Sequence, residues 1–154
     1  MKATTLLRVQ HRSLERLVAR LGGERHLRMP LVLQLVEELM THLSIEDHFF
    51  LSPIADRVGI RVGRFREDQA AVRNAVLQAV FAEGDDALFG ERLRDLATAM
   101  ERHVRTIERD LLPLVESQIR ADELERLGDR MQAFWNAAIA TETATRASHV
   151  HAAE

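Results

Sequence analysis

The chain has 154 residues, a formal net charge of -3 and an apolar content of 46%. This length suits one ordinary domain with a single continuous core, so a second domain is not expected. Acidic and basic residues are interspersed along the chain, which argues against nucleic acid or an anionic membrane surface as a partner. Cysteine is absent, which excludes disulfides, a catalytic thiol and thiolate metal sites, and leaves nitrogen and oxygen ligands as the available metal chemistry.

Composition also indicates the fold class and the compartment. Three Pro, seven Gly and no Tyr, in a chain dominated by Leu, Ala, Arg and Glu, predict an all-α protein. The stretch Met1 to Val9 has one Lys and a very short apolar run, and no later segment has the uncharged length that a bilayer requires. We therefore expect a cytoplasmic protein without a membrane partner.

The first two predicted helices carry polar residues on their buried stripes. Helix-breaking residues bound the first near Thr4 to Leu21 and the second near Leu31 to Ile54. The first stripe reads Leu7, His11, Leu14, Val18 and Leu21, and the second reads Val32, Leu35, Leu39, His42, Glu46 and Phe49. His48 faces away from the second stripe, so a surface position is expected for it.

The remaining predicted helices continue this pattern. They span about Val62 to Ala82, Asp86 to Val115, where Pro113 should kink or end the helix, and Asp122 to Thr145. Their stripes read Phe65, Gln69, Val72, Val76 and Ala79, with Asp68 at the edge; then Phe89, Leu93, Leu96, Met100, His103, Ile107, Leu111 and Leu114; then Leu124, Leu127, Met131, Phe134 and Ala138.

Short connections between long amphipathic helices favour antiparallel neighbours. The sequence therefore predicts an up-down-up-down four-helix bundle with an additional C-terminal helix. We expect residues 1–146 to form this domain and residues 147–154 to be a disordered tail. The aromatic side chain of Trp135 packs the fifth helix onto the bundle in this interpretation, and a homodimer contact is the alternative use of that face.

Polar residues interrupt the apolar stripe on all four bundle helices, and something must satisfy them, since an unpartnered buried polar group costs about 1 to 3 kcal/mol. His42 and Glu46 stand one helical turn apart and can chelate one ion. His103 and Glu108 are five residues apart and point about 140° away from each other on a regular helix. A single histidine on such a stripe is usually a hydrogen-bonded core residue, but four interrupted helices favour a shared metal site.

Three motifs resemble the hemerythrin family, specifically the bacterial HHE cation-binding domains. They are Val9-Gln-His-Arg12, then His42-Leu-Ser-Ile-Glu-Asp47 leading to Pro53, then His103-Val-Arg-Thr-Ile-Glu108 leading to Pro113. The resemblance implies a four-helix bundle that holds a non-haem di-iron centre, used for oxygen binding, peroxide handling or sensing. It also implies that His11, His42, Glu46, His103 and Glu108 stand at ligand positions.

The third predicted helix departs from the family pattern because it contains no histidine. Asp68 and Val72 stand where the family has ligands, and Asp68 or Gln69 is the candidate substitute. Glu46 and Glu108 are then the main anionic ligands, which suits one divalent ion better than two. Geometry alone accepts iron, zinc or manganese.

Two functional hypotheses follow. The first is a hemerythrin-like metal-binding protein, with one iron ion or a partial di-metal site, that senses or handles oxygen, peroxide, redox state or iron; any enzymatic activity would be that of peroxide- or oxygen-reactive non-haem iron. The second is a metal-free helical scaffold or interaction module, in which the same side chains form a buried hydrogen-bond network.

Overall fold

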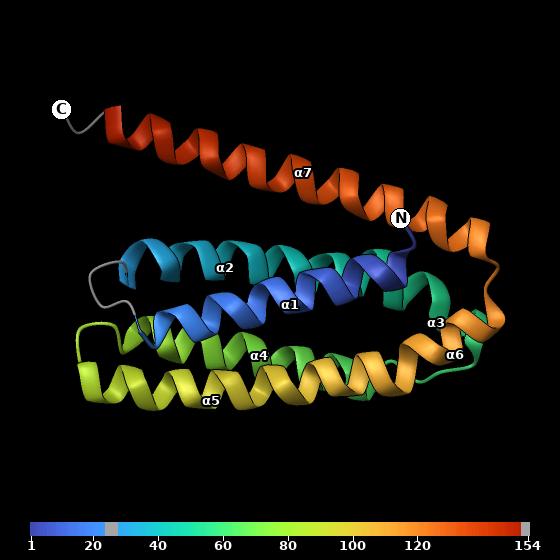
Figure 1. Ribbon diagram of the computed structural model, residues 1–154, viewed down its shortest axis with the longest axis horizontal. Coiled ribbons are helices and arrows are strands. Elements are labelled where there is room, and N and C mark those ends of the chain that lie inside the picture. The colour runs from blue at the N-terminus through green and yellow to red at the C-terminus, as the bar shows by residue number, and fades with distance from the viewer. Residues whose placement is uncertain (24–27, 152–154) are drawn as a thin grey trace.

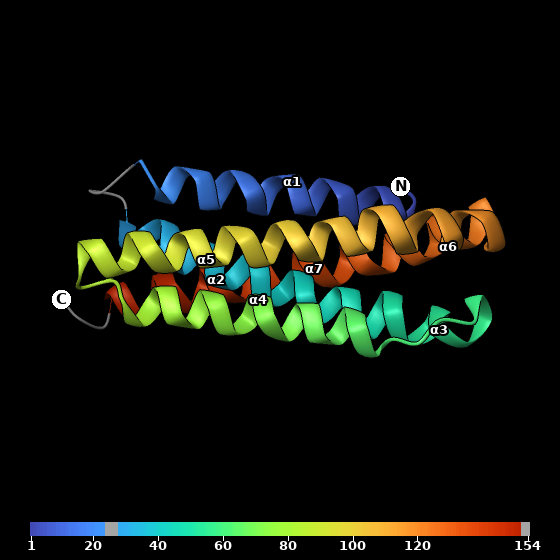
Figure 2. The same cartoon turned by 90° about the horizontal axis from the view of Figure 1, so that it is seen from below.

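The computed structural model describes residues 1–23 and 28–151, with side chains up to residue 141, and these residues form helices without any strand. The all-α expectation is confirmed. Four long helices lie side by side: α1 (Ala3–Leu21), α2 (Arg28–Ile45), α4 (Gly63–Phe81) and α5 (Asp86–Arg105). The chain direction alternates from each of these helices to the next (Figures 1 and 2).

Two of these helices continue through a π-helical segment. Helix α2 leads into η2 (Glu46–Leu51) and then α3 (Ser52–Val58), and α5 leads into η3 (Thr106–Leu111) and then α6 (Leu112–Gln118). The N–H of Ser52 donates to the carbonyl of Asp47, five residues earlier, and the N–H of Leu112 does the same to Ile107. The single helix expected to Ile54 is therefore corrected, and the helix expected to Val115 is interrupted just before Pro113, where a kink or an end was expected.

Proline explains the place of both π segments. Pro53 and Pro113 each occupy the second position of the short α-helix that follows. A proline inside a helix cannot donate a hydrogen bond, and its ring collides with the carbonyl four residues earlier. The wider π turn accommodates this, and such turns occur frequently at functional sites.

Helix α7 (Ala121–His151) crosses the outer side of α1 and α2 in Figure 1. Its backbone is helical for five residues beyond the boundary expected at 146, while residues 152–154 lie outside the described residues, so the boundary stays a prediction. Trp135 packs against the apolar core, and Phe134 is 39% exposed; the homodimer contact also stays a prediction. None of the helices, over the described residues, has an apolar stretch of bilayer-spanning length.

The apolar core is divided into two clusters along the bundle axis. One contains Leu14, Leu39 and Met100, and the other contains Leu7, Ile45 and Ile107. Helices α1 and α2 contribute to both clusters, and α5 does so together with its continuation η3. The buried histidines of α1, α2 and α5 fall between the two clusters. Polar side chains are therefore enclosed by apolar packing on both sides, at the middle of the bundle.

Candidate metal centre

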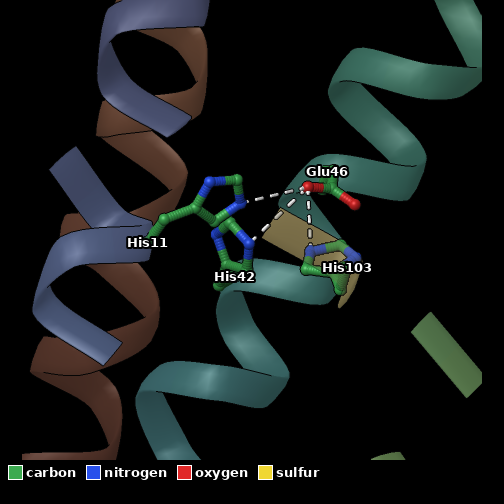
Figure 3. Close-up of side chains that lie close together, drawn as sticks. All are labelled: His11, His42, Glu46 and His103. Atoms are coloured by element: carbon green, nitrogen blue, oxygen red, sulfur yellow. Dashed lines mark ion pairs between the residues drawn. The ribbon is translucent and has the colours of Figure 1, made fainter. Parts of the chain in front are cut away.

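Three imidazole rings and one carboxylate meet between the two core clusters (Figure 3). His11 comes from α1, His42 from α2 and His103 from α5, while Glu46 is the first residue of η2. The Oε2 atom of Glu46 lies 3.6 Å from the Nε2 of His11, 3.6 Å from the Nε2 of His42 and 3.4 Å from the Nε2 of His103. Three nitrogens on three different helices thus face one oxygen. We call these four residues the four-residue group.

The inward atoms of the four-residue group have no hydrogen-bond partner among the described residues. This applies to Glu46 Oε2 and to the Nε2 atoms of His11, His42 and His103. All four residues are at most 2% exposed. Leaving four buried polar atoms without partners is costly, at about 1 to 3 kcal/mol each. A bound cation would satisfy all four at once.

The outward atoms of the same side chains, by contrast, are mostly hydrogen-bonded. His11 Nδ1 donates to Glu108 Oε1 at 2.9 Å, and His42 Nδ1 donates to Gln10 Oε1 at 3.0 Å. Gln69 Nε2 donates to Glu46 Oε1 at 2.7 Å. These bonds place protons on the outer nitrogens of His11 and His42, so their Nε2 lone pairs point toward the centre.

Electrostatics in the four-residue group favour an ionised Glu46. Burial alone would raise the pKa of Glu46, but the surrounding imidazoles, His103 first, hold it well below its usual range. Burial and the neighbouring histidines hold the pKa of His42 well below its usual range, so this ring is neutral near pH 7. Neutral imidazole and ionised carboxylate are the protonation states that bind metals.

Glu108 lies at the edge of the four-residue group. Its carboxylate accepts from the outer nitrogen of His11 and from Arg12 Nη2 at 2.9 Å, and its side chain is 17% exposed. The five-residue step from His103 contains part of the η3 turn, which carries more residues per turn than an α-helix. This turn explains how His103 and Glu108 both reach α1 despite their spacing.

Asp68 does not join the four-residue group either. Its Oδ1 atom forms an ion pair with Arg102 Nη2 at 2.7 Å. Gln69, the alternative considered from the sequence, is the third-helix residue that contacts the group, as a hydrogen-bond donor to Glu46. Val72 is fully buried in the apolar cluster. The structure therefore brings together His11, His42, Glu46 and His103, and leaves Glu108 and Asp68 outside.

Sequence reasoning named Gln10 and Arg12 only as neighbours of His11 in the first motif and assigned neither of them a role. Gln10 is 4% exposed, and it lies three residues after Leu7 and four before Leu14, so it fits the helical spacing of the buried face although the predicted stripe did not include it. The sequence offered a partial indication of Gln10, because a buried histidine needs an acceptor for its second nitrogen and a nearby amide can supply one. Arg12 offered no such signal, because a surface arginine is ordinary.

The spacing of the four-residue group suits a metal ion. One ligand atom from each residue can be chosen so that all four lie within 4.8 Å of one another. Two ligands of one first-row ion, each at about 2.1 Å, stand at most about 4.2 Å apart. Small side-chain rotations therefore suffice to bring the donors to bonding distance, and the residues fit a mononuclear site.

Comparison with known families agrees with this chemistry. Residues 2–115 match the family model described as the hemerythrin HHE cation binding domain, which covers the bundle helices and both π segments. The match ends before α7 begins. No curated protein and no solved structure matched the chain.

Proposed function

This chain belongs to the hemerythrin HHE cation-binding domain family, and from that premise we propose that it binds one metal ion through His11, His42, Glu46 and His103. The observation that carries the proposal is the set of four buried atoms that converge on one point and have no hydrogen-bond partner within the described part of the chain. Iron is the ion that the family resemblance implies, so we propose iron, with zinc or manganese as ions that accept the same donors.

The role we propose is sensing or handling of dioxygen, peroxide, redox state or iron. A bound iron ion would supply one-electron chemistry and a coordination position for a small oxygen species. The protein's own contribution is to hold three imidazoles and one carboxylate in the core, between two apolar clusters that enclose them on both sides. We propose first that the protein binds these species without converting them. If it is an enzyme, its activity would be that of a non-haem iron that reacts with peroxide or dioxygen.

A metal-free helical scaffold is the second candidate function. The observation in its favour is that Gln10 and Gln69 already satisfy one atom each of His42 and Glu46, as a purely structural network would require. The four inward atoms weigh against it, because the separations of 3.4 to 3.6 Å are longer than good hydrogen bonds.

Elemental analysis of protein purified without chelators separates the two functions. We expect about one iron, zinc or manganese ion per chain after supplementation. His42→Ala should abolish binding, whereas His48→Ala, which changes an exposed histidine on the adjoining turn, should keep it. A metal content near zero in the unmodified protein, or equal loss in both variants, would overturn the metal proposal and favour the scaffold.

The redox role needs its own measurement. Protein loaded with ferrous iron under anaerobic conditions should change its near-ultraviolet and visible absorption when dioxygen or peroxide is added. The His42→Ala variant should give the signal of free iron only. An iron-loaded protein whose spectrum is indifferent to both oxidants would contradict the sensing or handling role while leaving metal binding intact.

A further inference from the structure

We infer that Glu108 acts as a positioning residue that orients His11, and is not itself a ligand of the ion. This inference rests on the proposed function, because it assigns a role within the same site. It also departs from the ligand role that the family resemblance implies for this position. Three features of the surroundings of Glu108 support it.

The two nitrogens of His11 have opposite surroundings. Nδ1 lies 2.9 Å from Glu108 Oε1, while Nε2 faces Glu46 Oε2 at 3.6 Å. An ionised carboxylate can only accept a hydrogen bond, so Glu108 requires a proton on Nδ1. A neutral imidazole carries one proton, and the lone pair must then be on Nε2, which points to the centre of the four-residue group. Glu108 thus selects the tautomer that can bind an ion.

Arg12 holds the other oxygen of the Glu108 carboxylate. Its Nη2 atom lies 2.9 Å from Glu108 Oε2, and its Nη1 atom donates to Glu15, one turn further along α1. Both oxygens of Glu108 are therefore engaged in charge-assisted hydrogen bonds, which are stronger than neutral ones. To become a ligand, Glu108 would have to turn at least one oxygen away from these partners, so the hydrogen bond and the ion pair together hold it at the periphery.

The neighbouring ring repeats this arrangement with a neutral acceptor. His42 Nδ1 donates to Gln10 Oε1, and its Nε2 likewise faces Glu46. The rings of His11 and His42 meet edge to face, with centroids 4.8 Å apart. Glu108 and Gln10 thus each hold one of these rings with its Nε2 atom toward Glu46. Ligating histidines commonly donate their second N–H to such an outer acceptor. Glu108 occupies that outer place for His11.

The first test uses the metal-free protein and the nitrogen NMR signals of its imidazoles at alkaline pH, where the rings are neutral. We expect His11 to carry its proton on Nδ1 in the unmodified protein and in Glu108→Gln, whose amide oxygen can still accept. Glu108→Ala should populate the other tautomer. An unchanged tautomer in Glu108→Ala would overturn the inference, whatever the metal content of the protein.

The second test uses Co²⁺ as the probe, because the intensity of its visible bands reports the number of ligands. Glu108→Ala should bind one Co²⁺ with an unaltered spectrum and an affinity lower by about 10- to 100-fold. Glu108→Gln should recover most of that loss. A changed band intensity in both variants would show that Glu108 is a ligand and would overturn the inference.

Glu116→Ala is the matched control for general loosening of the bundle. Glu116 pairs with Arg8 of α1 at 2.8 Å, much as Glu108 pairs with Arg12, and its carboxylate has no histidine partner among the described residues. This variant should keep the affinity for Co²⁺, and an equal loss there would overturn the inference. Failure of the unmodified protein to bind Co²⁺ would count against the proposed function alone, since the NMR test does not depend on metal.

Discussion

Arg102 Nη2 lies 2.7 Å from Asp68 Oδ1, and this ion pair joins α5 to α4 beside the four-residue group. It engages the carboxylate that the sequence offered as a replacement for a third-helix ligand. One turn further along α4, Val72 contributes only apolar surface to the core. Helix α4 therefore contributes a hydrogen bond from Gln69 to the four-residue group and no member of the group itself. The candidate ligands of the group come from α1, α2, η2 and α5 and are enough for one ion.

Restoring third-helix donors should add a second ion. In Asp68→His with Val72→Glu, an imidazole and a carboxylate stand one helical turn apart and can chelate together. We expect the metal-to-protein ratio to rise from about one to about two, measured by elemental analysis. The metal-free double variant should also melt at a lower temperature, because the introduced glutamate would bury a charge, and added metal should reverse this loss.

The matched control places the new carboxylate two helical turns from the new histidine instead of one. In Asp68→His with Val76→Glu, the new acid replaces another fully buried valine of α4. This variant should be destabilised to a similar degree without recovery on addition of metal. A ratio of one in the Val72→Glu double variant would mean that α4 does not face a second metal position.

Gln69→Leu tests the hydrogen bond that fixes the outer oxygen of Glu46. Leucine keeps most of the side-chain volume but removes the donor 2.7 Å from Glu46 Oε1, which is fully buried. The free energy of unfolding of the metal-free protein should fall by about 1 to 3 kcal/mol, measured in urea. Gln132→Leu, which removes an exposed hydrogen bond to Asn136 on α7, should change it by less than about 0.5 kcal/mol. Equal effects in the two variants would contradict the expected role of Gln69.

Metal affinity should decrease as the pH falls through the neutral range. Burial alone would lower the pKa of His11, but its hydrogen bond to Glu108 and the nearby charge of Glu46 together outweigh burial and raise this pKa above the usual value. A raised pKa means that protons compete with the ion at Nε2 up to a higher pH. Glu108→Gln removes one of the charges that raise this pKa, so the midpoint of the affinity curve should move to lower pH. Competition with a chromophoric chelator at several pH values measures both midpoints, and an upward shift would contradict the assignment.

Gly128→Ala should disturb the packing of α7 against the start of the chain. A Cβ atom at this position would lie 2.0 Å from the carbonyl oxygen of Met1 and 2.8 Å from the nitrogen of Ala3. We expect a loss of about 1 to 3 kcal/mol in a thermal or urea unfolding experiment. Gly90→Ala on α5 is the control, because its Cβ would meet only a flexible arginine at 3.8 Å. Alanine there should stabilise the protein by about 0.5 to 1 kcal/mol.

Much of the site was predictable because helical periodicity reports burial directly. His11, His42, Glu46 and His103 lie on apolar stripes in the sequence, and all four are buried and adjacent in the structure. The ligand role of these four residues stays a prediction. Asp68 lies on the same buried face, but periodicity does not say which partner a buried carboxylate will find. Its ion pair depends on how α4 and α5 are paired in space.

Periodicity failed at the π segments. The predicted stripes placed Phe49 and Leu114 in the core, whereas the structure buries Phe50 and Val115 completely and leaves the two predicted residues partly buried. In both places the buried residue lies one position further toward the C-terminus than predicted, within or shortly after a π segment. A regular helical repeat cannot anticipate this shift, although Pro53 and Pro113 indicated that the repeat would be disturbed.

Each π segment in effect accommodates one residue more than an α-helix of the same rise. Without the π turn, the same residues of Glu46–Leu51 or Thr106–Leu111 in regular α-helical winding would turn everything downstream by about 100° around the helix axis. Ile54 and Val58, now in the core, would then rotate toward water. Each π segment therefore keeps the residues beyond it in register with the core, even though it looks like an irregularity when viewed by itself.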